Sequence, residues 1–256
     1  MAKSEIVGIV SAAGQASRLG KLPLSKELLP VGFENGKTRV AADHLLESYI
    51  VAGVSQIHVI IRDGKWDIPA FYGSSFNNTP VCYHIAKYGY GVPFTVNQAY
   101  PFVKDKTIVF GFPDILFEPK NAFKTLLSKL RDDDETIVML GSVTVSNPKK
   151  WDIVKTGNDG FVERILIKSS DTGKNNNNWF IAAWKPKFTE FLNSFVTKAL
   201  YNNTVTNSKG LEFHLGDVLN AALASGIIIK DVVFKNGKSL DIGTPEDLQL
   251  ANTFLQ

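Results

Sequence analysis

Short apolar runs alternate with stretches of helical periodicity along the first half of this chain. An apolar run followed by a helical pattern, repeated several times, predicts a parallel sheet covered by helices on both faces. In such sheets, ligands bind beyond the carboxyl ends of the strands. The expected strands cover residues 6–13, 56–61, 81–85, 107–112 and 136–145, and the expected helices cover residues 40–52, 66–72, 94–103 and 121–130.

The pattern changes after about residue 146. A hairpin is expected from residues 153–154 and 161–167, which are joined through Gly157-Asn158-Asp159-Gly160. Thr244-Pro245-Glu246-Asp247 opens a last helix, with a threonine N-cap, a proline in the first turn and two acids at the positive helix end. The other expected elements are strands at residues 179–184 and 227–234 and helices at residues 186–199 and 213–224.

Composition excludes several classes of protein. The 256 residues are 44% hydrophobic and 21% charged, so we expect one α/β domain with a substantial core. The net charge is only +3, with Lys and Arg scattered, which argues against nucleic-acid binding. No apolar run approaches the roughly 18 residues of a membrane span. The single cysteine, Cys82, excludes an intrachain disulfide, no signal peptide is visible, and we expect a cytoplasmic protein.

Residues 9–31 carry the most informative motif. An apolar strand runs into Gly14 and a loop of small residues that carries Arg18, and Lys26 follows eight residues later. Small residues let backbone N–H groups approach an anion, while arginine adds a planar fork and lysine a point charge. The spacing is neither that of a Walker loop nor that of a dinucleotide fingerprint. The stretch therefore predicts a polyphosphate site of another kind.

This stretch resembles the opening motif of the sugar-1-phosphate nucleotidyltransferases, roughly Ala-Gly-Gly-x-Gly-Thr-Arg-Leu followed by Pro-Lys-x-Leu-Leu-Pro-Val. The chain has Ala12-Ala13-Gly14-Gln15-Ala16-Ser17-Arg18-Leu19 and then Ser25-Lys26-Glu27-Leu28-Leu29-Pro30-Val31. Ser25 replaces a proline, and Ala16 replaces a glycine, which is costly if φ is positive there. The likeness is greatest to the glucose-1-phosphate thymidylyl- and uridylyltransferases and extends over residues 6–255.

The resemblance implies the nucleotide-diphospho-sugar transferase fold, a Rossmann-like mixed, mainly parallel sheet flanked by helices. It also implies that residues 1–256 form a single nucleotidyltransferase domain. Within it, residues of about 1–145 would bind the nucleotide and residues of about 146–256 the sugar phosphate.

Several nucleotide contacts are implied by the same resemblance. Arg18 would hold the β- and γ-phosphates, and Lys26 would stabilise charge at the α-phosphate. The backbone at Ala13 and Gly14 would approach the nucleotide. Gly91, in the turn Tyr88-Gly89-Tyr90-Gly91-Val92-Pro93, would let the backbone approach the base, although Ala86 stands where the family often has a base-reading glutamine.

Two aspartates are candidate metal ligands. Asp114 follows the apolar run 107–112 at its carboxyl end, a place that also suits a turn or N-cap aspartate. Asp241 lies in Leu240-Asp241-Ile242-Gly243-Thr244-Pro245-Glu246-Asp247-Leu248, which resembles the closing motif of the family. The resemblance implies that both bind Mg²⁺, a cation that prefers oxygen ligands. Spacing alone does not pair two residues so far apart in the chain.

Lys168 and Glu212 are the candidate sugar-phosphate contacts. Lys168 follows the expected strand 161–167 in Ile167-Lys168-Ser169, where the family has Glu-Lys-Pro, and the resemblance implies that the lysine reaches the phosphate. It is also compatible with a solvent lysine that ends a strand. Glu212 precedes an amphipathic helix, and the resemblance implies that it binds sugar hydroxyls.

We therefore expect Mg²⁺-dependent transfer of a nucleotidyl group from dTTP or UTP to a sugar-1-phosphate, with release of pyrophosphate. A regulatory protein that binds a nucleotide sugar without turnover is an alternative, because the motifs depart at Ala16, Ser25, Ala86 and Ile167. A glycosyltransferase of related fold is another, although residues 113–116 supply one carboxylate where an Asp-x-Asp pair is usual. The expected partners are the two small-molecule substrates, without nucleic acid or membrane, and a homo-oligomer is compatible with the sequence.

Overall fold

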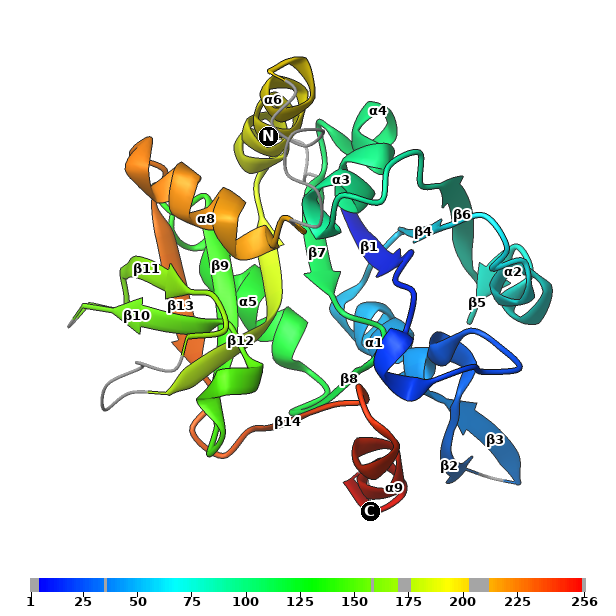
Figure 1. Ribbon diagram of the computed structural model, residues 1–256. Coiled ribbons are helices and arrows are strands. Elements are labelled where there is room, and N and C mark those ends of the chain that lie inside the picture. The colour runs from blue at the N-terminus through cyan, green and yellow to red at the C-terminus, as the bar shows by residue number, and fades with distance from the viewer. Residues whose placement is uncertain (1–4, 35, 158, 170–175, 203–211, 255–256) are drawn as a thin grey trace.

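The computed structural model describes residues 5–34, 36–157, 159–169, 176–202 and 212–254 (Figure 1). Its strands are β1 (Ile6–Ala12), β2 (Pro30–Glu34), β3 (Lys37–Val40), β4 (Gln56–Ile61), β5 (Ser75–Phe76), β6 (Thr79–Ile85), β7 (Thr107–Gly111), β8 (Ile115–Glu118), β9 (Val138–Thr144), β10 (Ile153–Thr156), β11 (Val162–Leu166), β12 (Asn177–Trp184), β13 (Ile229–Val233) and β14 (Lys238–Asp241). Its helices are α1 (Ala41–Ala52), α2 (Asp67–Tyr72), α3 (Val92–Val96), α4 (Tyr100–Val103), α5 (Ala122–Arg131), α6 (Pro186–Tyr201), α8 (Leu215–Ala224) and α9 (Pro245–Phe254), with short 3-10 helices η1 (Ser17–Leu19), η2 (Lys26–Leu28), η3 (Asn97–Ala99) and η4 (Pro148–Lys150).

The central sheet is mixed, as the sequence predicts. Its parallel centre has the order β7-β1-β4-β6, and β12 continues it antiparallel to β7. The ladder places Ala12 of β1 opposite Ile61 of β4, and Val10 opposite Gly111 of β7. The three strands therefore end at one edge of the sheet. The segments that leave these strands gather at that edge, which is where a ligand is expected.

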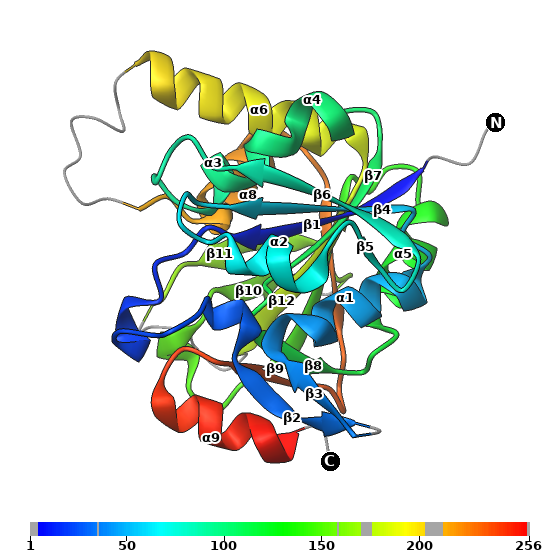
Figure 2. The ribbon, with the colours of Figure 1, turned by 90° about the vertical axis from the view of Figure 1, so that its right-hand side faces the viewer.

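Helices cover both faces of the sheet (Figure 2). One core lies between the sheet and α1, α2 and α5, and the other lies between the sheet and α3, α4, α6 and α8. Because the central strands are buried on both faces, they are apolar along their length rather than alternating. α9 forms a smaller core with β2, β8 and β14. None of the helices in the described residues is long and apolar enough to cross a lipid bilayer.

Most of the expected elements are confirmed to within a few residues at their ends. The expected helix at residues 94–103 is wrong as a single element, since it is divided into α3, η3 and α4. Pro101 lacks the N–H that a continuous helix would need, and it instead lies in the first turn of α4. The β10–β11 hairpin forms as expected, with Asn158 of its turn outside the described residues.

The pairings β2–β3 and β8–β14 were not predicted. Strands β8 and β14 have four residues each, too few to show a period in the sequence. They pair antiparallel, outside the central sheet.

The segment between β1 and β2, residues 13–29, is called the opening segment below. Two interactions attach it to the connection from β4 to α2. Glu27 forms a buried ion pair with Lys65, with both carboxylate oxygens within 2.8 Å of Nζ. Ser25 donates from its N–H and its hydroxyl to the carboxylate of Asp67, at 2.6 and 2.8 Å. Glu27 is 1% exposed and Lys65 5% exposed, so the first of these interactions is shielded from water.

His44 connects α1 to β8. Its Nε2 accepts a hydrogen bond from the N–H of Phe117 at 3.1 Å, and the two rings meet edge to face. The side chain is buried, and burial lowers the pKa of His44 from 6.5 to about 4. The native structure therefore requires the neutral imidazole with Nε2 unprotonated.

We expect protonation of His44 to reduce the stability of the native protein as the pH falls from 6.5 towards 4. The unfolded chain binds a proton on His44 in this window and the native chain does not, so protonation favours unfolding, by roughly 3 kcal/mol at the acid end. Denaturant unfolding at a series of pH values should show that the parent loses stability relative to His44→Gln, which keeps an acceptor, as the pH falls through this window. An equal dependence in both proteins would contradict the assignment. His58, whose pKa burial also lowers to about 4, should contribute in the same direction, whereas Asp241 and Asp231, whose pKa values burial raises to about 6 and about 7, should contribute in the opposite direction.

A second prediction concerns the Glu27–Lys65 pair. Lys65→Met leaves Glu27 buried without its cation, which should reduce the free energy of unfolding by about 3–5 kcal/mol. The double variant Glu27→Leu/Lys65→Met removes both charges and should recover most of that loss. Urea titration of the three proteins measures both effects. A single variant as stable as the parent would show that the pair does not hold the opening segment.

Candidate active site

The opening segment leaves β1 at the carboxyl edge of the sheet and returns Lys26 beside its own start. A Cβ on Gly14 would lie 3.9 Å from Cε and 4.0 Å from Nζ of Lys26. The lysine ammonium therefore lies next to the glycine backbone, as a phosphate-binding loop requires. Ala13, half-buried, precedes Gly14, which is exposed.

Ala16 has a φ of 54°, in the left-handed region. This is the position where the sequence motif normally has glycine, and the alanine therefore adopts a conformation that costs a residue with a Cβ about 1–2 kcal/mol. The departure from the motif thus places a Cβ in a left-handed stretch of the loop. It adds local strain to it.

The two predicted metal ligands are brought together by the pairing of β8 with β14. Asp114 directly precedes β8, Asp241 is the last residue of β14, and Asp241 lies opposite Ile115 in the ladder. The N–H of Ile242 also donates to the carbonyl of Asp114 at 2.8 Å. Asp114 is 8% exposed. The backbone thus fixes two largely buried carboxylates next to each other.

Each carboxylate has a cation from the opening segment. Lys26 Nζ donates to Asp114 Oδ2, and Arg18 Nη2 lies 3.6 Å from Asp241 Oδ2. Burial, together with the negative charge of Asp114, raises the pKa of Asp241 to about 6. Burial opposes the charge on Lys26, but Asp114 outweighs it and the pKa of Lys26 is raised. The site therefore groups two carboxylates with two cationic side chains.

Because Gly243 has no side chain, it leaves room for the guanidinium of Arg18 beside Asp241. A Cβ at position 243 would lie 2.7 Å from Nη2 of Arg18 and 3.0 Å from Oδ2 of Asp241. The guanidinium therefore lies against the bare backbone of the closing motif. The opening and closing motifs fit each other at this point.

Asp114 and Asp241 could hold a divalent cation between them. The described residues contain no group of three or more His, Cys, Asp or Glu side chains that could do so. Two carboxylates are nevertheless the usual protein share of a Mg²⁺ site, in which phosphates and water supply the other ligands. The repulsion that Asp241 experiences from Asp114 is what such a cation would relieve.

Gly91 is required by the backbone conformation at its position. It has a φ of 110° and forms a bridge with Phe213, and a Cβ would lie 2.1 Å from the carbonyl oxygen of Phe213. Glu212, which is exposed, lies beside it, because its Cγ would be 3.0 Å from the same Cβ. The structure thus joins these two predicted residues through the close approach of two chain segments.

Lys168 lies on the second half of the molecule, after β11. It is exposed, with a φ of 43°. Burial raises the pKa of Asp152, and the positive charges of His214 and Lys168 oppose that rise. Lys168 and His214, the N-cap residue of α8, therefore both act electrostatically on the carboxylate of Asp152. Sequence analysis did not single out Asp152 or His214 as site residues.

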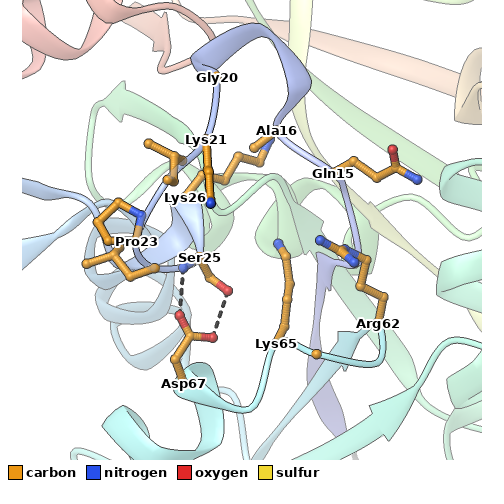
Figure 3. Close-up of a pocket in the computed structure, with 13 residues that line it drawn as sticks. Gln15, Ala16, Gly20, Lys21, Pro23, Ser25, Lys26, Arg62, Lys65 and Asp67 are labelled. Atoms are coloured by element: carbon orange, nitrogen blue, oxygen red, sulfur yellow. Dashed lines mark hydrogen bonds between the residues drawn. The ribbon is translucent and has the colours of Figure 1, made fainter.

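Sequence analysis also missed a cleft of about 430 Å³ between the opening segment and the β4–α2 connection (Figure 3). Arg62 and Lys65 line it from one side, and Lys21 and Lys26 from the other. Both residues of the first pair come shortly after the apolar run 56–61. The rule that ligands bind at the carboxyl ends of parallel strands could have identified them.

The chain is similar to one known protein family and to several solved structures. The nucleotidyl transferase family matches residues 7–256. A Bacillus anthracis structure assigned as a glucose-1-phosphate thymidylyltransferase, in complex with a sucrose, has a TM-score of 0.81 and 20% identity over 97% of this chain and 94% of its own. A UDP-glucose pyrophosphorylase from Acinetobacter baumannii has a TM-score of 0.75 and 15% identity over 97% and 92%. A UTP-bound UGPase from the same organism has a TM-score of 0.78 and 15% identity over 98% and 93%.

At these identities the solved structures establish the fold, which is the one expected. The set of curated proteins contains no significant match to the chain. The family match covers nearly every residue, including the opening motif, both aspartates and the closing motif. The chain belongs to the nucleotidyl transferase family.

Proposed function

We propose that this protein transfers a nucleotidyl group from a nucleoside triphosphate to a sugar-1-phosphate and releases pyrophosphate. The observation that carries this proposal is the set of paired charges formed by Lys26 with Asp114 and by Arg18 with Asp241. Similarity to a thymidylyltransferase and to UDP-glucose pyrophosphorylases supports the substrate classes.

In this reaction an oxygen of the sugar phosphate bonds to the α-phosphorus. The bond from that phosphorus to the pyrophosphate oxygen breaks, and the pyrophosphate leaves with the electron pair. The attacking phosphate is ionised at neutral pH, so no strong general base is needed. Lys26, held beside the Gly14 backbone, is placed to stabilise the added charge at the α-phosphate.

We propose Mg²⁺ as the cofactor, held by Asp114 and Asp241, where it would supply positive charge to the phosphate oxygens. The two carboxylates fit this group because they adjoin each other and the negative charge of one raises the pKa of the other. Release of Lys26 and Arg18 from their carboxylates would free both cations to contact the phosphates.

For the second substrate, we propose Lys168 and Glu212 as the contacts to the sugar phosphate and the sugar hydroxyls. Both side chains are exposed. His214 lies two residues after Glu212, and its charge and that of Lys168 both oppose the rise in the pKa of Asp152. For the base we propose a pyrimidine, as in dTTP or UTP. Gly89, where a Cβ would meet nothing within 4 Å, leaves its backbone open to match a ring edge with one donor between two acceptors.

Incubation with each of four NTPs, Mg²⁺ and a panel of sugar-1-phosphates, followed by a pyrophosphate assay, tests the proposal. We expect pyrophosphate release with a pyrimidine NTP and at least one sugar-1-phosphate. Binding of a nucleotide sugar without turnover would instead indicate a regulatory protein. Transfer of sugar from a nucleotide sugar to an acceptor would indicate a glycosyltransferase.

Lys26→Ala should reduce turnover by about 10²–10³-fold, the usual effect of losing a preorganised charge donor. The Lys26 side chain is only 17% exposed and neutralises a buried carboxylate, so thermal unfolding of the variant should be measured alongside the rate. Lys37→Ala, an exposed lysine on β3, is the matched control and should keep the parent rate. Near-normal turnover of a folded Lys26→Ala protein at saturating substrate would exclude the catalytic assignment.

Asp114→Asn and Asp241→Asn should each raise the Mg²⁺ concentration needed for the half-maximal rate, because a carboxylate ligand loses its charge but not its volume. A Mg²⁺ titration of the rate measures this. Asp105→Asn, at an exposed position before β7, should leave the titration unchanged. If either site variant titrates like the parent, that aspartate is structural and not a ligand.

A further inference from the structure

The cleft between the opening segment and the β4–α2 connection, called the β4 cleft here, carries an excess of positive charge. Its lining includes Lys21, Lys26, Arg62 and Lys65, against the single carboxylate of Asp67. That carboxylate already accepts two hydrogen bonds from Ser25. A cleft of this composition is suited to an anion.

Two of the four cations have protein partners outside the cleft lining. Lys26 binds Asp114, and Lys65 binds Glu27. Within the described residues, Arg62 and Lys21 form no ion pair. These two side chains are therefore available to a ligand.

Arg62 extends into the cleft alongside Lys65 (Figure 3). Burial lowers the pKa of Lys65, Glu27 opposes this, and the positive charges of Lys26 and Arg62 lower the pKa further. Lys26 and Arg62 thus both lie within electrostatic range of Lys65. An anion bound among them would relieve their mutual repulsion.

The position of the cleft indicates which anion it would bind. Arg62 follows Ile61, which pairs with Ala12 immediately before the glycine loop. Lys26 both lines the cleft and binds Asp114, so the cleft adjoins the proposed site of transfer at the α-phosphate. Arg18, to which the sequence resemblance assigns the terminal phosphates, lies against Asp241 and Gly243, so the cleft offers those phosphates further cations.

We propose that Arg62 and Lys21 bind the terminal phosphates of the nucleoside triphosphate and the pyrophosphate that they become. The planar guanidinium of Arg62 supplies a bidentate contact to phosphate oxygens, and Lys21 supplies a point charge from the opposite wall. This assignment rests on the proposed function for the identity of the ligand.

Isothermal titration of the intact protein with pyrophosphate, in the presence of Mg²⁺, tests the assignment directly. Arg62→Gln should weaken pyrophosphate and NTP binding by about 10- to 100-fold, the effect of losing a charge-assisted contact, and Lys21→Gln by less. Arg62→Lys should restore part of the affinity. Arg131→Gln, an exposed arginine at the end of α5, is the control and should bind like the parent.

The same variants separate the terminal phosphates from the rest of the substrates. Arg62→Gln should leave the affinity for the nucleoside monophosphate and the KM for the sugar-1-phosphate unchanged. Equal weakening of monophosphate and triphosphate, or a raised sugar-1-phosphate KM alone, would overturn the assignment. So would unchanged pyrophosphate affinity in a folded Arg62→Gln protein, or no pyrophosphate binding by the parent.

Failure of the proposed function has a different signature. A parent protein that releases no pyrophosphate from any pair of substrates, yet binds pyrophosphate through Arg62, would contradict the transfer reaction and keep the anion site. A parent that turns over normally, with Arg62→Gln indistinguishable from it in pyrophosphate and NTP affinity, would contradict only the role of Arg62.

Discussion

The antiparallel pairing of β8 with β14 is the constraint on which the candidate site depends. It joins residue 115 to residue 241 and so sets two carboxylates side by side, although about half of the chain separates them. The pair is short, and its position is fixed by surrounding contacts. His44 accepts a hydrogen bond from β8, and α9 packs against both strands with a small apolar core. This pairing is therefore what brings Asp114 and Asp241 together.

The opening segment is the second half of the same arrangement. It carries the cations that neutralise the two carboxylates, and it is held in place by the buried Glu27–Lys65 pair. Glu27 follows Lys26 directly, so anchoring one of them orients the next. A buried ion pair contributes little net stability because desolvation offsets the attraction between its charges. Its value here is positional, since it ties a loop that carries a positive-φ alanine to the rigid edge of the sheet.

In the candidate site, each carboxylate is paired with a cationic side chain. The lining of the neighbouring β4 cleft has more cationic side chains than carboxylates. Lys26 belongs to both regions, because it lines the cleft and binds Asp114. Arg62 is exposed and forms no ion pair within the described residues, whereas Lys26 is paired with Asp114. In the proposed reaction, the cations that now bind protein carboxylates would exchange them for substrate phosphates.

The sequence by itself determined the class of sheet, because strands buried on both faces must be apolar and their helices periodic. It also predicted an anion-binding loop with Gly14, Arg18 and Lys26, since small residues and cations follow a strand end there. Only the tertiary structure decided that Asp114 and Asp241 adjoin, because strands of four residues carry no readable period. It alone decided that Gly91 is demanded by contact with Phe213, and that Arg62 shares a cleft with Lys26, because both depend on segments remote in sequence.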